Sequence, residues 1–126
     1  MRIWDFPVDL LCSAHLSAEH RELHGILGCI NKNSKNGYIN HPEVKRWIGN
    51  LPALYRRHQD QLNSFIIRNP NHIHSSYIDT SYSNVIDVEM IESLESQYAN
   101  IASKRNNENH KCTCDLIKLK EYMDSI

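Results

Sequence analysis

Two side chains in the stretch HLSAEHREL, residues 15–23, have the types and the spacing for acid–base chemistry. His15 and Glu22 are seven residues apart, so on an α-helix they lie two turns apart on the same side. Both fall at the border of the apolar face, where nonpolar neighbours alter the proton affinity of a carboxylate. An ordinary surface ion pair is the alternative, and the spacing by itself favours that alternative.

The helix that positions these residues is predicted from Val8 to about Asn31, because apolar residues recur there at helical spacing. Its apolar face comprises Cys12, Leu16, Leu23, Leu27 and Ile30. The opposite, water-facing side comprises Ser13, Ser17, His20, His24 and Asn31. A third face of small residues surrounds Arg21, namely Ala14, Ala18, Gly25 and Gly28. Such a face allows close approach, either of another helix or of a phosphate backbone that Arg21 contacts.

The residues ahead of this helix are long enough to reach Glu22. Six extended steps from Met1 to Pro7 span roughly 20 Å. The helix rises roughly 21 Å from Val8 to Glu22. An arm that folds back along its own helix therefore brings the terminal amine of Met1 within reach of the carboxylate.

The charge is unevenly distributed along the 126 residues, although the net charge is only −1. Residues 1–78 carry nine Lys and Arg against six Asp and Glu, together with seven of the eight histidines. Residues 79–126 carry five basic residues against nine acidic ones. A polyanion is therefore expected to meet the first part, with the last third as a counterweight or a lid.

The four cysteines lack the spacing of a small secreted disulfide scaffold, and no stretch has the pattern of a signal peptide or a membrane span. A reduced, intracellular setting without membrane association is therefore expected. His110, Cys112 and Cys114 are spaced like half of a metal site, but no second pair stands at zinc-ribbon spacing. Packed or solvated thiols, and no metal, are the expectation here.

The remaining pattern is helical, with turn-rich connections. Helical stretches are expected over 42–68, with a break at residues 49–52, and over 85–105 and 114–125. Polar loops are expected at 31–37, 75–84 and 106–113. We predict an all-α, compact single-domain helical bundle with long loops and an N-terminal arm. Residues 1–78 form its core, and 79–126 form a C-terminal helical segment of the same domain.

The run His-Leu-x-Ala-Glu-x-Arg-Glu-Leu at residues 15–23, behind a short arm, resembles the pyrimidine-dimer DNA glycosylase and abasic-site lyase family. Phage members of that family incise DNA at ultraviolet photoproducts. The similarity continues through GYINHPEVKRWIGNLPALYRRHQDQL at residues 37–62 and covers about the first 75 residues. The resemblance implies a monomeric repair enzyme that acts on damaged double-stranded DNA and needs no cofactor.

The resemblance also implies which residues act. In the family the nucleophile is the α-amine of the mature N-terminal residue, and the key carboxylate is the Glu of Arg-Glu-Leu. By position these are Met1 and Glu22, with Arg21 and His15 as DNA-contacting neighbours. The phage enzymes lose their initiator Met, whereas the bulky Arg2 is expected to retain Met1 here.

The implied mechanism suits these groups. A terminal α-amine has a pKa of about 8, well below that of lysine, so much of it is neutral near pH 7. Its attack on C1′ of the damaged nucleotide expels the base and leaves an imine. Glu22 would stabilise the positive charge on the sugar and assist the β-elimination that nicks the strand. Access to C1′ requires an extruded nucleotide.

Further DNA contacts are expected from basic and aromatic residues, namely Arg2, Arg46, Trp47, Arg56 and Arg57. Arginines bind phosphates, and a tryptophan wedges or stacks against bases. A solvated charge is the alternative for Arg2, and a core position is the alternative for Trp47. His58 lies in line with Leu54 and Leu62, so we predict a buried, hydrogen-bonded histidine.

The sequence departs from the phage pattern at several positions. Gly25 replaces a second phosphate-contacting Arg, Ala14 replaces a Gln, and the acidic segment 79–126 replaces a basic aromatic tail. Lesion choice therefore stays open between pyrimidine dimers, abasic sites and oxidised bases. Two other functions compete: a non-catalytic DNA-binding module, and a metal-dependent hydrolase, for which the sequence offers no tight His and Asp constellation.

Overall fold

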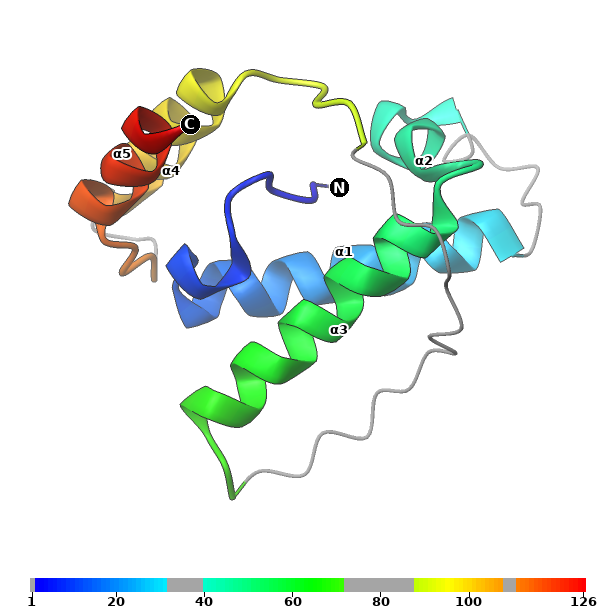
Figure 1. The fold of residues 1–126 in the computed structure, drawn as a ribbon, viewed down its shortest axis with the longest axis horizontal. Helices are drawn as coiled ribbons and strands as arrows, with labels where there is room; N and C mark the ends of the chain where they lie inside the picture. Colours follow the sequence, from blue (N-terminus) through cyan, green and yellow to red (C-terminus); the bar gives the residue numbers. More distant parts are fainter. Residues whose placement is uncertain (1, 32–39, 72–87, 108–110) are drawn as a thin grey trace.

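Five α-helices and a 3₁₀ turn make up the computed structural model, which describes residues 2–31, 40–71, 88–107 and 111–126 (Figure 1). The elements are η1 (Val8–Leu10), α1 (Ser13–Asn31), α2 (Pro42–Trp47), α3 (Leu51–Arg68), α4 (Leu94–Arg105) and α5 (Leu116–Ser125). No strand occurs in these described ranges, which confirms the predicted all-α fold. None of these helices is long and apolar enough to cross a membrane.

The helices form two groups around an N-terminal arm, residues 2–7. Helices α1 and α3 cross each other, and α2 packs against both of them (Figure 1). Helices α4 and α5 pair with each other on the side where α1 begins (Figure 1). The arm runs between the two groups, and its residues together contact side chains from several helices (Figure 1).

The periodicity predicted a helix from Val8, but helix α1 begins only at Ser13. The turn η1 closes with a hydrogen bond from the Leu11 amide to the Val8 carbonyl (3.1 Å). Leu11 is then extended (φ −84°, ψ 139°) and its side chain is buried. The first helical hydrogen bond runs from the Leu16 amide to the Cys12 carbonyl (2.9 Å). Apolar residues before α1 therefore belong to a turn whose side chains fill the core.

The break between α2 and α3 overlaps the predicted one at 49–52 but ends earlier, because α3 already begins at Leu51. Gly49 has φ +81°, the left-handed conformation that glycine adopts without a Cβ clash. The Asn50 amide donates to the Trp47 carbonyl (2.9 Å), and Pro52 occupies the first turn of α3, where its missing N–H costs nothing.

Capping residues fix the starts of the last two helices. Helix α4 begins at Leu94, later than predicted, because Ser93 Oγ accepts from the Ser96 amide (3.1 Å). Helix α5 begins after Asp115, whose carboxylate accepts from the amides of Ile117 and Lys118 (3.0 and 3.2 Å). The predicted loop at 75–84 and most of the loop at 31–37 lie outside the described residues.

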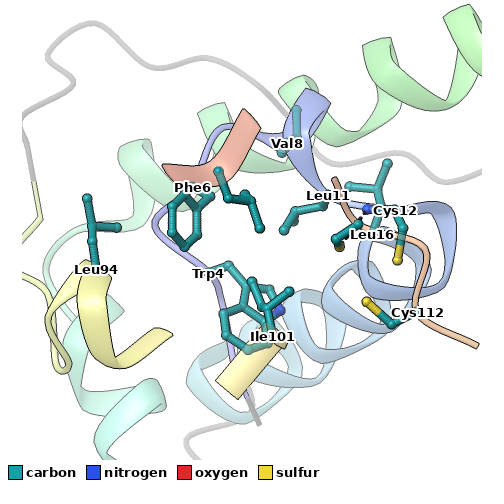
Figure 2. Close-up of a cluster of buried hydrophobic side chains, with 11 residues drawn as sticks. Trp4, Phe6, Val8, Leu11, Cys12, Leu16, Leu94, Ile101 and Cys112 are labelled. Atoms are coloured by element: carbon teal, nitrogen blue, oxygen red, sulfur yellow. Dashed lines mark hydrogen bonds between the residues drawn. The ribbon is translucent and has the colours of Figure 1, made fainter. Parts of the chain in front are cut away.

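The arm takes part in both hydrophobic clusters that the described residues form. Ile3 packs with the second half of α1 and with Val44, Trp47 and Leu54. Trp4 and Phe6 pack with the start of α1 and with the C-terminal segment, as Figure 2 shows for Leu94, Ile101 and Cys112. Helices α4 and α5 and the residues just before α5 therefore share a core with the arm.

Candidate active site

A cavity of about 710 Å³ lies beside the first three turns of α1. Its lining comes from three parts of the chain: Arg2 and Trp4 of the arm; Ala14, His15, Ala18, Glu19, Arg21 and Glu22 of α1; and Asn100, Lys104 and Lys111 of the C-terminal segment. We call it the large cavity. It brings together four of the predicted site residues, Arg2, His15, Arg21 and Glu22.

The two glycines on the small-residue face of α1 have no neighbour packed on them in the described part of the chain. Gly25 is exposed, and a Cβ added at Gly25 or Gly28 would meet no atom within 4 Å. Ala14 and Ala18 line the large cavity. This face is therefore accessible to a ligand, and Arg21 within it is exposed.

Three consecutive amides of the arm are held by side chains from three helices. The Ile3 amide donates to Glu43 of α2 (2.9 Å), and the Trp4 amide donates to Glu19 of α1 (2.8 Å). The Asp5 amide donates to Gln97 of α4 (2.9 Å). The backbone leading to Arg2 is therefore fixed beside α1.

Glu19 is a site-forming residue that the sequence interpretation missed. It is 1 % exposed and accepts two hydrogen bonds from Arg57, through Nε (3.0 Å) and Nη2 (2.9 Å). It also accepts from the Gln61 amide group and from the Trp4 backbone. The spacing of Glu19 indicates a buried position, because the residue lies three residues after Leu16 and four before Leu23 on the apolar face.

These contacts separate the roles of the two neighbouring carboxylates. The oxygens of Glu19 accept four hydrogen bonds in total, which fills the acceptor capacity of a carboxylate. Glu19 therefore orders the arm and leaves no acceptor for a reacting group. Glu22 lines the same cavity one turn later and is only half-buried.

The structure places the two adjacent arginines of α3 in different settings. The guanidinium of Arg57 is committed to Glu19, and its side chain is 15 % exposed. Arg56 is exposed and pairs with Asp60 one turn later (3.4 Å). Of these two predicted phosphate contacts, only Arg56 has a solvent-facing charge. Neither residue lines the large cavity.

Arg46 and Trp47 lie inside the protein. The side chain of Arg46 is 5 % exposed, and it pairs with Asp5 and with Glu43 (3.2 Å). It also donates to the Ile3 carbonyl (3.3 Å). Trp47 is buried in the core, with the Arg46 guanidinium 4.7 Å from its ring centre. These positions indicate that both residues hold the arm in place. The alternative of a core position is confirmed for Trp47.

Arg2 is half-buried between the large cavity and a smaller one. Its Nη2 lies 2.8 Å from Glu92 Oε1, and its guanidinium lies 4.7 Å from the Trp4 ring centre. The hydrogen bonds from Arg2 and then from Ser96 hold the pKa of Glu92 below its ordinary value. The charge of Arg2 is therefore partly exposed and paired with Glu92.

The smaller cavity, about 290 Å³, lies on the other side of the arm. Its charged lining residues are Arg2 and Arg46 against Asp5, Glu43 and Glu92, with no excess of positive charge among them. Burial raises the pKa of Glu43, although the Ile3 amide and Arg46 act in the opposite direction. This cavity is therefore poorly suited to a polyanion.

The C-terminal segment contributes basic residues to the large cavity. Lys104 Nζ lies 5.5 Å from the Trp4 ring centre, and Lys111 lines the same space. Both residues belong to a segment whose net charge is negative. The composition of that segment therefore gave no indication of a basic site. The large cavity thus carries Arg2, Arg21, Lys104 and Lys111 around Glu19 and Glu22.

His15 is buried, with an exposed fraction of 4 %. Its ring packs edge-on against Trp4, with the centres 5.5 Å apart. Its Nδ1 lies 3.1 Å from Cys12 Sγ and 3.6 Å from Cys114 Sγ. His15 therefore lines the large cavity from within the core, and its Nδ1 faces sulfur.

The predicted core position of His58 is confirmed, because the residue is fully buried. Its ring stacks on His20 with the centres 5.0 Å apart, which brings His20 closer to the core than predicted. Burial, followed by the positive charges of His20 and His24, lowers the pKa of His58 to about 4.

Two residues singled out in the sequence, Met1 and His110, lie outside the described residues.

Residues 1–78 match the family model described as pyrimidine dimer DNA glycosylase. The matched part contains the arm and α1 to α3, and it ends before the segment that supplies Lys104 and Lys111. No curated protein and no solved structure matches the chain.

Proposed function

The chain belongs to the pyrimidine dimer DNA glycosylase family, and on that premise we propose that it excises a damaged base from double-stranded DNA and then cleaves the strand as an abasic-site lyase. Cyclobutane pyrimidine dimers are the proposed substrate. The observation that carries the proposal is the meeting of Arg2, Arg21 and Glu22 at one cavity.

The proposed nucleophile is the α-amine of Met1. Arg2 lines the large cavity, and one residue spans at most about 3.6 Å. An amine on the preceding residue is therefore within reach of the space that Glu22 lines. The fixed amides of Ile3, Trp4 and Asp5 support this role, because a nucleophile must be held in position to react efficiently.

Glu22 is the proposed catalytic carboxylate. The amine attacks C1′, and the bond from C1′ to the base breaks, the base leaving with the bonding electrons and taking up a proton. Glu22 stabilises the positive charge that develops on the sugar and transfers protons as the ring opens to an imine. Removal of a C2′ proton then expels the 3′ phosphate, and water hydrolyses the imine.

The basic residues of the large cavity are the proposed phosphate contacts. Arg21 is exposed, and Lys104 and Lys111 of the C-terminal segment line the same cavity. Together with Arg2 they suit the two backbone arms that flank an extruded nucleotide. Arg56 is a further, peripheral contact. Arg46, Trp47 and Arg57 act indirectly in this proposal, by ordering the arm and α1.

Borohydride trapping on a duplex with a single abasic site tests the proposal. Reduction of the imine links protein to DNA, and mass spectrometry of the peptides locates the linked nitrogen. The expected adduct is on the amine of Met1, and it is expected to disappear when two residues are added ahead of Met1. The variant E22Q is expected to lose trapping by about 100-fold or more, whereas E121Q, an exposed change on α5, retains it.

The outcomes separate the competing functions. An adduct on Lys104 or Lys111, which line the same cavity, would assign the nucleophile to the C-terminal segment and remove the role of Met1. DNA binding without any adduct, unchanged in E22Q, would establish a non-catalytic binding module. Parallel duplexes that carry a pyrimidine dimer or an oxidised base then determine the lesion.

A further inference from the structure

Four metal-ligand side chains from two distant segments gather at the start of α1. Cys12 and His15 stand one turn apart, and Cys112 and Cys114 precede α5. One ligand atom from each lies within 4.8 Å of all the others. Figure 2 shows Cys12 and Cys112 on the facing segments of this cluster. His110, the residue that first suggested a half-site, is not needed for it.

The cluster is buried in the core. All four residues are buried, with exposed fractions between 3 % and 8 %. The side chains of Cys112 and Cys114 point to the same side of a non-helical segment, and Thr113 between them is exposed, as expected for alternation along an extended chain. No disulfide joins these cysteines.

The spacing of the ligand atoms fits a tetrahedral ion. Zinc binds sulfur at about 2.3 Å and nitrogen at about 2.0 Å, so tetrahedral angles place two sulfurs about 3.8 Å apart and a sulfur and a nitrogen about 3.5 Å apart. The distances from His15 Nδ1 to Cys12 Sγ and Cys114 Sγ, 3.1 and 3.6 Å, lie around that value. The Cys12 amide also donates to Cys114 Sγ (3.2 Å), an outer contact that suits a thiolate.

We propose that Cys12, His15, Cys112 and Cys114 bind one zinc ion in a structural Cys₃His site. Three thiols release their protons to solvent, and the neutral imidazole binds through Nδ1. Four protein ligands leave no open position, so this site holds structure and takes no part in the chemistry at C1′. The inference is independent of the proposed function.

The proposed ion would join parts of the chain that are 102 residues apart. It would tie the segment before α5 to the helix that carries Arg21 and Glu22. Lys111 precedes a ligand, and His15 is itself a ligand in the wall of the large cavity. The zinc site therefore positions the C-terminal wall of the cavity.

Metal analysis of protein purified without added zinc tests this proposal. One zinc per chain is expected, and X-ray absorption should show three sulfur ligands at about 2.3 Å and one nitrogen at about 2.0 Å. Replacement by cobalt should produce the visible bands of a tetrahedral thiolate site. Both spectra use the unaltered chain, so they do not depend on any variant folding.

Variants then locate the ion. C112S and C114S are expected to lose the zinc, whereas C29S, a change of the one cysteine outside the cluster, should retain it. Four titratable thiols and no bound metal in the native protein would overturn the proposal. Zinc retained in C112S but lost in H24Q would also overturn it, because the ion would then belong to His20, His24 and His58, whose ring nitrogens also lie within 4.8 Å of one another.

Discussion

Individual side chains in this protein divide into those that meet solvent in the large cavity and those that hold the cavity together. Arg21 is exposed and Glu22 half-buried, whereas Glu19 is buried with every acceptor position filled. The three residues lie within one turn of the same helix. Their different roles come from what packs on each side of α1.

Replacing Glu19 by alanine is expected to destabilise the protein by about 3–5 kcal/mol, because Arg57 would keep a largely buried charge without its carboxylate. The measurement is chemical unfolding followed by circular dichroism. D60N, which breaks the exposed pair with Arg56, is the matched control and should change the free energy of unfolding by less than about 1 kcal/mol. A similar small effect for E19A would contradict the assigned role.

The lowered pKa of His58 leads us to expect that the protein loses stability in weak acid. Its pKa is about 4 in the folded protein, against 6.5 in the unfolded chain, so the unfolded state binds more protons between these values. Stability is therefore complete above pH 6.5 and falls as the pH decreases toward 4. Between pH 7 and pH 5 the loss from His58 should be about 2 kcal/mol.

Unfolding measured across this range in the protein and in H58F tests the assignment. H58F should flatten the pH dependence, since phenylalanine binds no proton. Burial and the charge of His20 also lower the pKa of His24, so a smaller slope of the same sign should remain. An unchanged slope in H58F would assign the effect to other groups.

At the scale of elements, the arm is positioned by three helices that follow it at different distances along the chain. Helices α1, α2 and α4 each hold one of its amides, through Glu19, Glu43 and Gln97. Arg46 adds contacts to Asp5 and to the Ile3 carbonyl. An N-terminal segment, which usually frays, is thereby ordered up to Arg2.

The variant Q97A tests this ordering. Gln97 is buried and both accepts from the Asp5 amide and donates to the Asp5 carboxylate (2.9 Å each). Its loss should cost about 1–3 kcal/mol of stability, because the Asp5 groups lose buried partners. Hydrogen exchange of the Asp5 amide should accelerate, and imine trapping should slow. Q59A, which removes an exposed hydrogen bond to Asn63 within α3, should affect neither readout.

At the scale of the whole molecule, the last third supplies the part of the large cavity that lies outside the family match. The match ends at residue 78, whereas Asn100, Lys104 and Lys111 line the large cavity. The same segment packs on Trp4 and Phe6. The C-terminal segment therefore adds positive charge at the large cavity, although its own net charge is negative.

The pair of changes K104Q and K111Q tests this contribution. Each lost phosphate contact should reduce the slope of log K against log salt by about 0.9, so the double variant should lose about 1.8. The matched control is K118Q with K120Q, which removes the same charge from exposed positions on α5 outside the cavity lining. Equal slopes in the two double variants would mean that only net charge matters.

From the proposed zinc site we expect a chelator to destabilise the last third of the chain. Removal of a structural zinc withdraws the free energy of binding from folding. The melting temperature should fall, and proteolysis should begin between α5 and α4. Zinc should restore the original melting temperature and magnesium should not, because the ligands are thiolates and an imidazole. The variant C29S should respond as the unaltered protein does.

Much of the local structure could be predicted from the sequence. Helical periodicity, Gly49 and Pro52 located the helices and the α2–α3 break, because these signals act over a few residues. The start of α1 was predicted too early, since the apolar residues of η1 fit the helical period but are extended or in a turn. The family resemblance located Arg21 and Glu22 by position within one helix.

The chain by itself determined the all-α fold, the family, and the helix that carries Arg21 and Glu22. Only the tertiary structure decided that Glu19 pairs with Arg57, that Arg46 holds the arm, and that Lys104 and Lys111 complete the cavity. It also brought Cys12 and His15 to Cys112 and Cys114. The physical reason is that helix formation depends on neighbours three or four residues apart, whereas these partners, 38 to 102 residues apart, are chosen by the packing of a shared core.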